Sequence, residues 1–101
     1  MWLMVQFDLP VETPAERREY TLFRKRLLGL GFSMHQKSIY LRWDETDGQG
    51  LATAMAIRKS LPPEGEVAIF VLPERAMTSS AFYHDGMRTS GPEIPSALAL
   101  F

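Results

Sequence analysis

The feature that most constrains the fold is the opening segment, which is almost wholly apolar and ends abruptly in an acid. Residues 1–8 read Met-Trp-Leu-Met-Val-Gln-Phe-Asp and are followed by Leu9-Pro10. A short apolar run that ends at a turn predicts a buried β-strand. Since side chains alternate between the two faces of a strand, Gln6 and Asp8 are expected on the same face.

A helix is predicted next, because the sequence carries signals for both of its ends. Thr13 can cap the helix together with Glu16 three residues later, and Pro14 occupies the first helical position. Gly31 is the expected stop. Apolar residues recur between these ends at the spacing of one helix face. They are Tyr20, Phe23, Leu27 and Leu30.

The remaining segments complete an alternating order of strands and helices. Phe32–Trp43 is expected to be one extended, bent strand, with a split into two strands as the alternative. Leu51–Leu61 is predicted as a shorter helix that Pro62-Pro63 stops, and Glu66–Leu72 as a buried strand. A weak further strand is expected around residues 81–83.

This order predicts an α+β domain of ferredoxin-like βαββαβ architecture, with an antiparallel sheet and both helices on one face. The domain is expected to span residues 1–85. Residues 86–101 are rich in Ser, Pro and Gly and then become apolar, so a flexible C-terminal tail with an apolar end is expected.

Length and composition narrow the class of protein. A chain of 101 residues forms one domain with a thin core, and oligomerisation would stabilise it. The absence of cysteine excludes disulfides and zinc sites of the cysteine type. No secretory leader is evident, and no apolar run approaches the length of about 20 residues that spans a bilayer. A cytoplasmic protein without a membrane segment is therefore expected.

The net charge of −1 argues against a nucleic-acid-binding protein until its distribution is considered. Residues 1–42 carry seven Lys and Arg against four acids, whereas the remainder carries four against eight. Part of the excess lies on the first predicted helix and could bind a phosphate backbone, with a solvated helix face as the alternative. These candidates are Arg17, Arg18, Arg24 and Lys25.

Asp8 is the candidate for metal chemistry. An acid at the end of a buried strand is costly unless it is exposed, paired or bound to a cation, although a turn-forming role is the simpler alternative. One carboxylate is a poor Mg²⁺ site, but a two-fold axis beside the strand would supply a second Asp8. Four polar or aromatic residues are expected on one face of the following strand, either near Asp8 or at a solvent-facing edge. They are Gln36, Ser38, Tyr40 and Arg42.

Several of these positions together resemble the CRISPR-associated Cas-two family, the small partner of the spacer integrase. The spaced match spans residues 1–42, and the order of elements extends it to about residue 85. The matching positions are Phe7-Asp8-Leu9-Pro10, Thr13, Arg17, Phe23-Arg24, Gly31-Phe32, Gln36, Ser38, Tyr40 and Arg42.

The resemblance implies a homodimer with facing sheets in which Asp8 of each protomer binds Mg²⁺. The family is classed as a metal-dependent endoribonuclease or deoxyribonuclease, and more generally it bridges the integrase subunits and binds duplex DNA during spacer acquisition. By the match, Arg17 contacts the DNA backbone, while Arg18 and Arg24 are assigned by proximity. Whether the chain is an enzyme or only a scaffold stays open.

The tail fits the same family, whose related members dock an apolar C-terminus onto the integrase. Docking to a sheet edge or groove is expected, with a frayed end or a tail folded on its own dimer as the alternative. The docking residues would be Ile94, Leu98, Leu100 and Phe101. Two other functions remain as alternatives, a toxin-like metal-dependent ribonuclease and a ferredoxin-like RNA-binding module.

Overall fold

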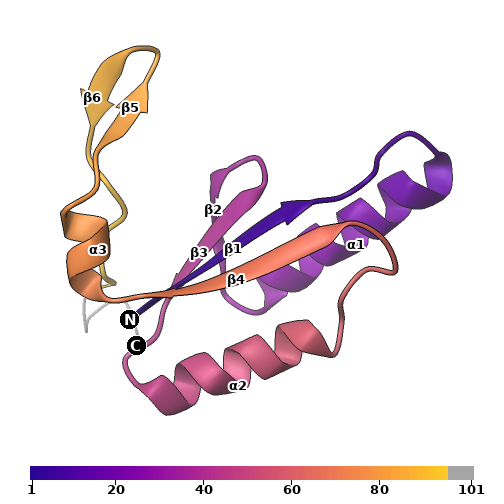
Figure 1. Ribbon diagram of the computed structural model, residues 1–101, viewed down its shortest axis with the longest axis horizontal. Helices are drawn as coiled ribbons and strands as arrows, with labels where there is room; N and C mark the ends of the chain where they lie inside the picture. Colours follow the sequence, from indigo (N-terminus) through magenta and orange to yellow (C-terminus); the bar gives the residue numbers. More distant parts are fainter. Residues whose placement is uncertain (96–101) are drawn as a thin grey trace.

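The computed structural model describes residues 1–95 of the chain (Figure 1). The elements follow one another in the order β1 (Trp2–Asp8), α1 (Pro14–Gly29), β2 (Ser33–Gln36), β3 (Ile39–Trp43), α2 (Asp47–Arg58), β4 (Glu66–Leu72), α3 (Glu74–Thr78), β5 (Phe82–His84) and β6 (Met87–Thr89).

The first four strands form one antiparallel sheet in the order β2-β3-β1-β4. β1 is central and pairs with β3 on one side and with β4 on the other. This is the ferredoxin-like arrangement that the order of segments predicts, so the predicted fold class is confirmed. β4 lies at the edge of this sheet, with no neighbouring strand on its outer side among residues 1–95.

Helix α1 begins and ends where its sequence signals place it. The Thr13 hydroxyl accepts a hydrogen bond from the Glu16 backbone N–H at 3.1 Å, and the Glu16 carboxylate accepts one from the Thr13 N–H at 2.9 Å. At the other end Gly31 adopts φ +88°, the left-handed conformation that lets the chain leave the helix. The capping box and the glycine stop are both confirmed.

The segment from Phe32 to Trp43 is a hairpin of two strands and not one bent strand. β2 and β3 pair antiparallel, with a register shift between Met34 and Gln36. The predicted single face for the four residues from Gln36 to Arg42 is therefore wrong, because the chain reverses between Gln36 and Ile39. The alternation of side chains that suggested one strand comes from two short strands with a turn between them.

Helix α2 starts earlier than predicted. Thr46 caps it by accepting a hydrogen bond from the Gln49 N–H at 3.1 Å, so the helix begins at Asp47 and not at Leu51. It ends at Arg58, three residues before Leu61. A capping threonine at position 46 was the available signal for the earlier start.

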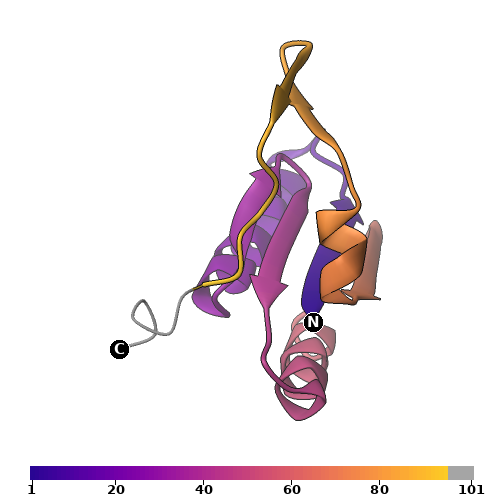
Figure 2. The ribbon, with the colours of Figure 1, turned by 90° about the vertical axis from the view of Figure 1, so that its left-hand side faces the viewer.

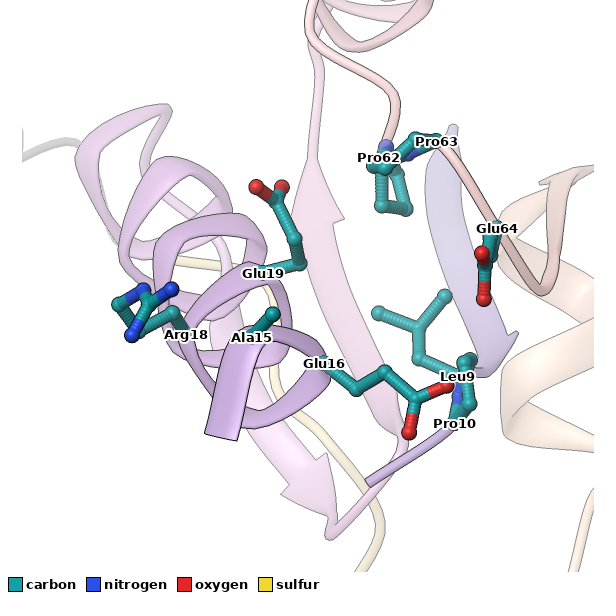
Figure 3. Close-up of a pocket in the computed structure, with 9 residues that line it drawn as sticks. All are labelled: Leu9, Pro10, Ala15, Glu16, Arg18, Glu19, Pro62, Pro63 and Glu64. Carbon is teal, nitrogen blue, oxygen red and sulfur yellow. The ribbon is translucent and has the colours of Figure 1, made fainter. Parts of the chain in front are cut away.

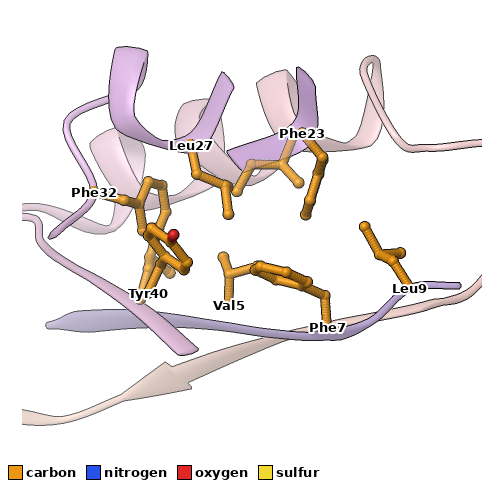
Figure 4. Packing of buried hydrophobic residues seen from close by; sticks show 9 residues of the cluster. Val5, Phe7, Leu9, Phe23, Leu27, Phe32 and Tyr40 are labelled. Carbon is orange, nitrogen blue, oxygen red and sulfur yellow. The ribbon is translucent and has the colours of Figure 1, made fainter. Parts of the chain in front are cut away.

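Helices α1 and α2 cover one face of the sheet and enclose the main core (Figure 4). Phe23 and Leu27 of α1 face Val5 and Phe7 of β1, with ring centroids 5.3 Å apart for Phe7 and Phe23. Burial of each such side chain contributes about 1.5–3 kcal/mol. The prediction that both helices lie on one face of the sheet is confirmed.

The opposite face of the sheet is only partly covered. A second apolar cluster forms over one end of it, around Trp2, Leu41 and Met77 of α3, and Ile94 packs against this cluster. Strands β5 and β6 form a separate hairpin that projects from the body (Figures 1 and 2). Residues 87–89 of the expected tail are thus a strand, whereas residues 96–101 lie outside the described residues.

Candidate metal-binding and nucleic-acid-binding site

Asp8 lies at the end of β1 on the open face of the sheet. Its neighbours Val5 and Phe7 point into the core under the helices, so alternation directs Asp8 to the face opposite α1 and α2. The Asp8 side chain is exposed, in a shallow hollow whose lining includes Gln6, Gly65 and Ala68. The carboxylate is accessible to a cation or a substrate from solvent.

Glu66 stands directly across from Asp8. The two residues are register partners between β1 and β4, and both are exposed. Side chains of directly opposed residues have Cβ atoms about 4.5–5.5 Å apart, and two like charges at that spacing repel each other. A bound cation would relieve the repulsion, so the pair suits a divalent ion with one or two carboxylate ligands.

Glu66 is not among the site residues predicted from the sequence. It sits 58 positions from Asp8, and only the pairing of the first and last strands of the sheet brings the two acids together. An antiparallel β1–β4 pair places the end of one strand beside the start of the other. The acid that opens the Glu66–Leu72 strand was therefore a usable signal once that strand order was assumed.

Gly65 places Glu66 in this register. Its φ is +89°, and a Cβ atom at this position would lie 2.6 Å from the Asp8 carbonyl oxygen. A glycine is required for both reasons, since the backbone turns in the left-handed region and passes close to β1. The approach of the loop to Asp8 therefore depends on Gly65.

The described part of the chain offers only these two carboxylates for a metal at Asp8. Among residues 1–95, no group of three or more His, Cys, Asp and Glu side chains could hold an ion. Mg²⁺ keeps several waters and usually takes one or two carboxylates together with substrate phosphates. The Asp8–Glu66 pair fits such an ion, and a second protomer would double the donor set.

Arg17 holds the loop that follows Asp8. Its guanidinium donates hydrogen bonds to the carbonyl oxygens of Val11 and Glu12, at 3.1 Å and 3.0 Å. These bonds tie the β1–α1 connection to the first turns of the helix. Arg17 therefore has a structural role in addition to the contact with nucleic acid that was predicted for it. Its side chain remains exposed.

The other three basic candidates have no carboxylate partner in the described residues. The ion pairs found between residues 1–95 are Arg42–Asp44 and His84–Asp85. Arg18 and Lys25 are exposed and seven positions apart, so they share the outer side of α1. Arg24 is half-buried and shares a flank of the helix with Arg17 by the same spacing.

These cations and Asp8 lie on opposite sides of the sheet. α1 packs against the Val5 and Phe7 face, whereas Asp8 lies on the other face. One protomer therefore presents two separate features, an acidic pair at a strand end and a basic helix surface. A single compact active site that combines them does not form within residues 1–95.

Two predicted polar positions have structural roles. The Tyr40 ring is fully buried and stacks on Phe7 with centroids 5.7 Å apart. Arg42 pairs with the buried Asp44 at 2.9 Å and also donates to the Leu30 carbonyl oxygen at the end of α1. Neither side chain reaches the hollow around Asp8.

The aromatic side chains of the central strands do not form a base-stacking surface. Trp2, Phe7 and Tyr40 on β1 and β3 are buried, Trp43 at the end of β3 is half-buried with its ring centroid 5.4 Å from that of Trp2, and Phe70 on the edge strand is 41% exposed. An RNA-recognition module needs exposed aromatic rings on its central strands. The RNA-binding alternative therefore lacks its main structural requirement in the described residues.

The expected docking residues fall in two places. Ile94 is half-buried against the cluster around Trp2, Leu41 and Met77 of its own chain. Leu98, Leu100 and Phe101 lie outside the described residues. No helix of residues 1–95 is both long enough and apolar enough to cross a membrane.

Comparisons with known proteins agree on one family. The family described as "CRISPR associated protein Cas2" matches residues 1–79. A protein of Paracidovorax avenae named "CRISPR-associated endoribonuclease Cas2" is 37% identical over 101 residues, which cover 100% of this chain and 94% of the relative. A protein of the same name from Parvibaculum lavamentivorans is 33% identical, with 100% of both chains covered.

A solved structure shows the same fold at low sequence identity. The crystal structure of Streptococcus pyogenes Cas2 at pH 6.5 superposes with a TM-score of 0.62 and 16% identity, and the match covers 83% of this chain and 100% of that one. The match of sequence over most of the chain and the shared fold lead to one conclusion. The chain belongs to the CRISPR-associated Cas2 family.

Proposed function

We propose that the protein is a homodimeric subunit of the CRISPR spacer-acquisition complex that bridges integrase subunits and binds duplex DNA. The observation that carries the proposal is the division of the protomer into two surfaces. One is an open sheet face with an unpaired edge strand, and the other is a helix whose cations have no carboxylate partner in residues 1–95. The first suits a second copy, and the second suits a phosphate backbone.

Apolar exposure on β4 supports the dimer. Phe70 and Val71 are 41% and 60% exposed on the edge strand, where unpaired backbone groups and apolar side chains favour association. Phe70 is the register partner of Met4, so it lies on the same open face as Asp8. A second copy placed across this face would cover Phe70 and bring the two Asp8 residues toward a common axis.

The surface of α1 supports binding to duplex DNA. Arg18 and Lys25 project from the outer side of the helix, and Arg24 lies on its flank. Contacts of this kind fix the position of DNA and carry no sequence information, as expected of a subunit that accepts many different spacers. The dimer would present two such helices on its outside.

A Mg²⁺-dependent nuclease is the second candidate, because the relatives carry the name endoribonuclease. Asp8 and Glu66 are the residues that would hold the ion, and their accessibility leaves room for a phosphodiester beside them. The ion would activate water and offset phosphate charge. Among residues 1–95, no histidine lines the hollow around Asp8, so this part of the chain offers little equipment for proton transfer there.

The integrase contact is proposed for the apolar C-terminal residues Leu98, Leu100 and Phe101. Their sequence alternates apolar and small residues, which suits a peptide that adds to a sheet edge or fills a groove. Ile94 anchors the start of this segment on its own sheet, so its role would be to direct the residues that follow.

The test compares Asp8→Asn with wild type in two assays, Mg²⁺-dependent cleavage of RNA and DNA, and spacer integration with the cognate integrase. The control is Glu93→Gln, which removes an exposed carboxylate outside the hollow around Asp8. The bridging function predicts that both variants support integration. Loss of cleavage in Asp8→Asn alone would establish the nuclease, and a wild-type protein that neither forms a complex nor supports integration would refute the bridging function.

A further inference from the structure

A small cleft opens beside the Asp8 end of β1, on the helix side of the molecule (Figure 3). It has a volume of about 220 Å³ and lies between three segments. These are the loop after β1 with Leu9 and Pro10, the first turns of α1 from Ala15 to Glu19, and the loop Pro62–Glu64 before β4. Drug-sized ligands need about 300–1,000 Å³, so the cleft has room for one long side chain.

The walls of the cleft are apolar and stiff. Leu9 is 8% exposed and forms the floor, and the rings of Pro10, Pro62 and Pro63 form much of the sides. Proline has a fixed φ and no N–H, so these walls move little and donate no hydrogen bonds. Gly65 allows the second loop to pack closely on Leu9, because a Cβ atom at this position would lie 2.7 Å from the Leu9 Cδ2 atom. The cleft is therefore preformed.

Two carboxylates that form no ion pair within residues 1–95 stand at its mouth. Glu19 extends from α1 toward the opening, Glu64 stands on the opposite wall, and Arg18 also contributes to the lining (Figure 3). Neither Glu19 nor Glu64 belongs to an ion pair within residues 1–95. The third acid, Glu16, already accepts hydrogen bonds from the N–H groups of Glu12 and Thr13. With three carboxylates against the single guanidinium of Arg18 among its lining residues, the cleft carries a net negative charge.

This charge selects among possible occupants. A nucleic-acid backbone would place phosphates beside Glu19 and Glu64 and would be repelled. The chain's own segment 96–101, Ser-Ala-Leu-Ala-Leu-Phe, carries no Lys or Arg that could pair with them. A protein segment with a basic side chain satisfies both the apolar walls and the acidic mouth, because the stem of Arg or Lys is apolar and its head is charged.

We propose that this cleft docks an Arg or Lys side chain of a protein partner, flanked by apolar residues. The aliphatic stem would pack on Leu9 and the prolines, and the charged head would lie between Glu19 and Glu64. The cleft borders the basic side of α1, with which it shares Arg18, and is separate from the open sheet face. The inference does not depend on DNA binding, on the nuclease or on the apolar tail.

The first experiment is an NMR titration of the ¹⁵N-labelled protein with two probe peptides, acetyl-Leu-Arg-Leu-amide and acetyl-Leu-Gln-Leu-amide. The arginine peptide is expected to shift the amide signals of Leu9, Ala15, Glu19 and Gly65, and the glutamine peptide is expected to shift them much less. Equal shifts with both peptides, shifts centred elsewhere or no shifts at millimolar peptide would each overturn the proposal.

Matched variants separate the cleft from general charge effects. Glu19→Gln with Glu64→Gln should weaken binding of the arginine peptide about fivefold, since each exposed ion pair contributes about 0.2–1 kcal/mol. Glu74→Gln with Glu93→Gln removes the same charge from positions that do not line the cleft and should leave the affinity unchanged. An equal loss in both double variants would overturn the proposal.

Discussion

Arg42 and Asp44 form an ion pair that joins three elements at one point. Asp44 is 1% exposed, and Arg42 also donates to the Leu30 carbonyl oxygen at the C-terminal end of α1. The Asp44 carbonyl oxygen in turn accepts a hydrogen bond from the Met1 amino group at 2.9 Å. This pair therefore links the ends of β3 and α1 to the start of β1.

Arg42→Ala should lower the free energy of unfolding by about 3 kcal/mol, because it leaves the buried Asp44 carboxylate without its partner. Urea denaturation monitored by circular dichroism measures the change. Arg42→Met with Asp44→Leu should recover much of the loss, since replacing both charges by apolar groups removes the unpaired ion. A single variant as stable as wild type would show that the pair contributes nothing.

Gly65 offers a second test at this scale, with Gly86 as a matched control. Both glycines have positive φ, +89° and +78°, but of the two only Gly65 faces a close atom, since no atom of residues 1–95 lies within 4 Å of a Cβ at Gly86. Gly86→Ala should cost about 1–2 kcal/mol of unfolding free energy from backbone strain alone. Gly65→Ala should cost clearly more in the same denaturation experiment, because its Cβ would also meet the Asp8 carbonyl oxygen. Equal costs would show that the loop can move away from β1.

At the scale of elements, helix periodicity brings the basic side chains of α1 together on its surface, where they are proposed to bind duplex DNA. Arg24→Ala with Lys25→Ala should weaken duplex DNA binding and flatten the dependence of log K on log salt by about 1.8, since each phosphate contact contributes about 0.9. Fluorescence anisotropy at several salt concentrations measures this slope. The control is Arg75→Ala with Arg88→Ala, two cations on α3 and β6. A slope equal to that of wild type would exclude these two side chains as phosphate contacts.

Local signals predicted the elements well where one short sequence decides the structure. Thr13 to Glu16 specifies the start of α1, and Gly31 specifies its end, and both are confirmed. The β5–β6 hairpin turns at Asp85-Gly86, which both have positive φ and are a strong hairpin pair in sequence. The Asp85-Gly86 pair was present in the sequence, but residues 86–101 were predicted as a flexible tail because they are rich in Ser, Pro and Gly. The reversal of the chain after Gln36 carries no comparable turn pair, so the split of Phe32–Trp43 into two strands was only the alternative prediction, and its position was not predicted.

The candidate site depends on pairings between distant segments, which single-sequence patterns do not carry. Asp8 was predicted because it ends an apolar run, an observation contained in eight residues. Glu66 was not, because its relevance comes from the β1–β4 register. Likewise, the hydrogen bonds from Arg17 to Val11 and Glu12 depend on the path of a loop, and helix periodicity gives no information about that path.

At the scale of the whole molecule, the open sheet face accounts for several separate observations. The face is covered near Trp2 by α3 and Ile94, but Phe70, the register partner of Met4, is 41% exposed, and Asp8 at the other end of β1 is exposed as well. A domain of this size has a thin core, so burying the exposed half in a second copy would add stability that the monomer lacks. The same contact would bring the carboxylates of two protomers into one neighbourhood.

Phe70→Glu should therefore convert the proposed dimer to a monomer, because a charge would be buried in the contact between the two sheets. Sedimentation equilibrium at micromolar concentration measures the mass directly. Leu22→Glu is the matched control, since Leu22 is 59% exposed on α1, on the other side of the sheet, and this variant should remain dimeric. If the wild type itself sediments as a monomer, the second Asp8 is absent. The Mg²⁺ site would then depend on Asp8 and Glu66 of one chain alone.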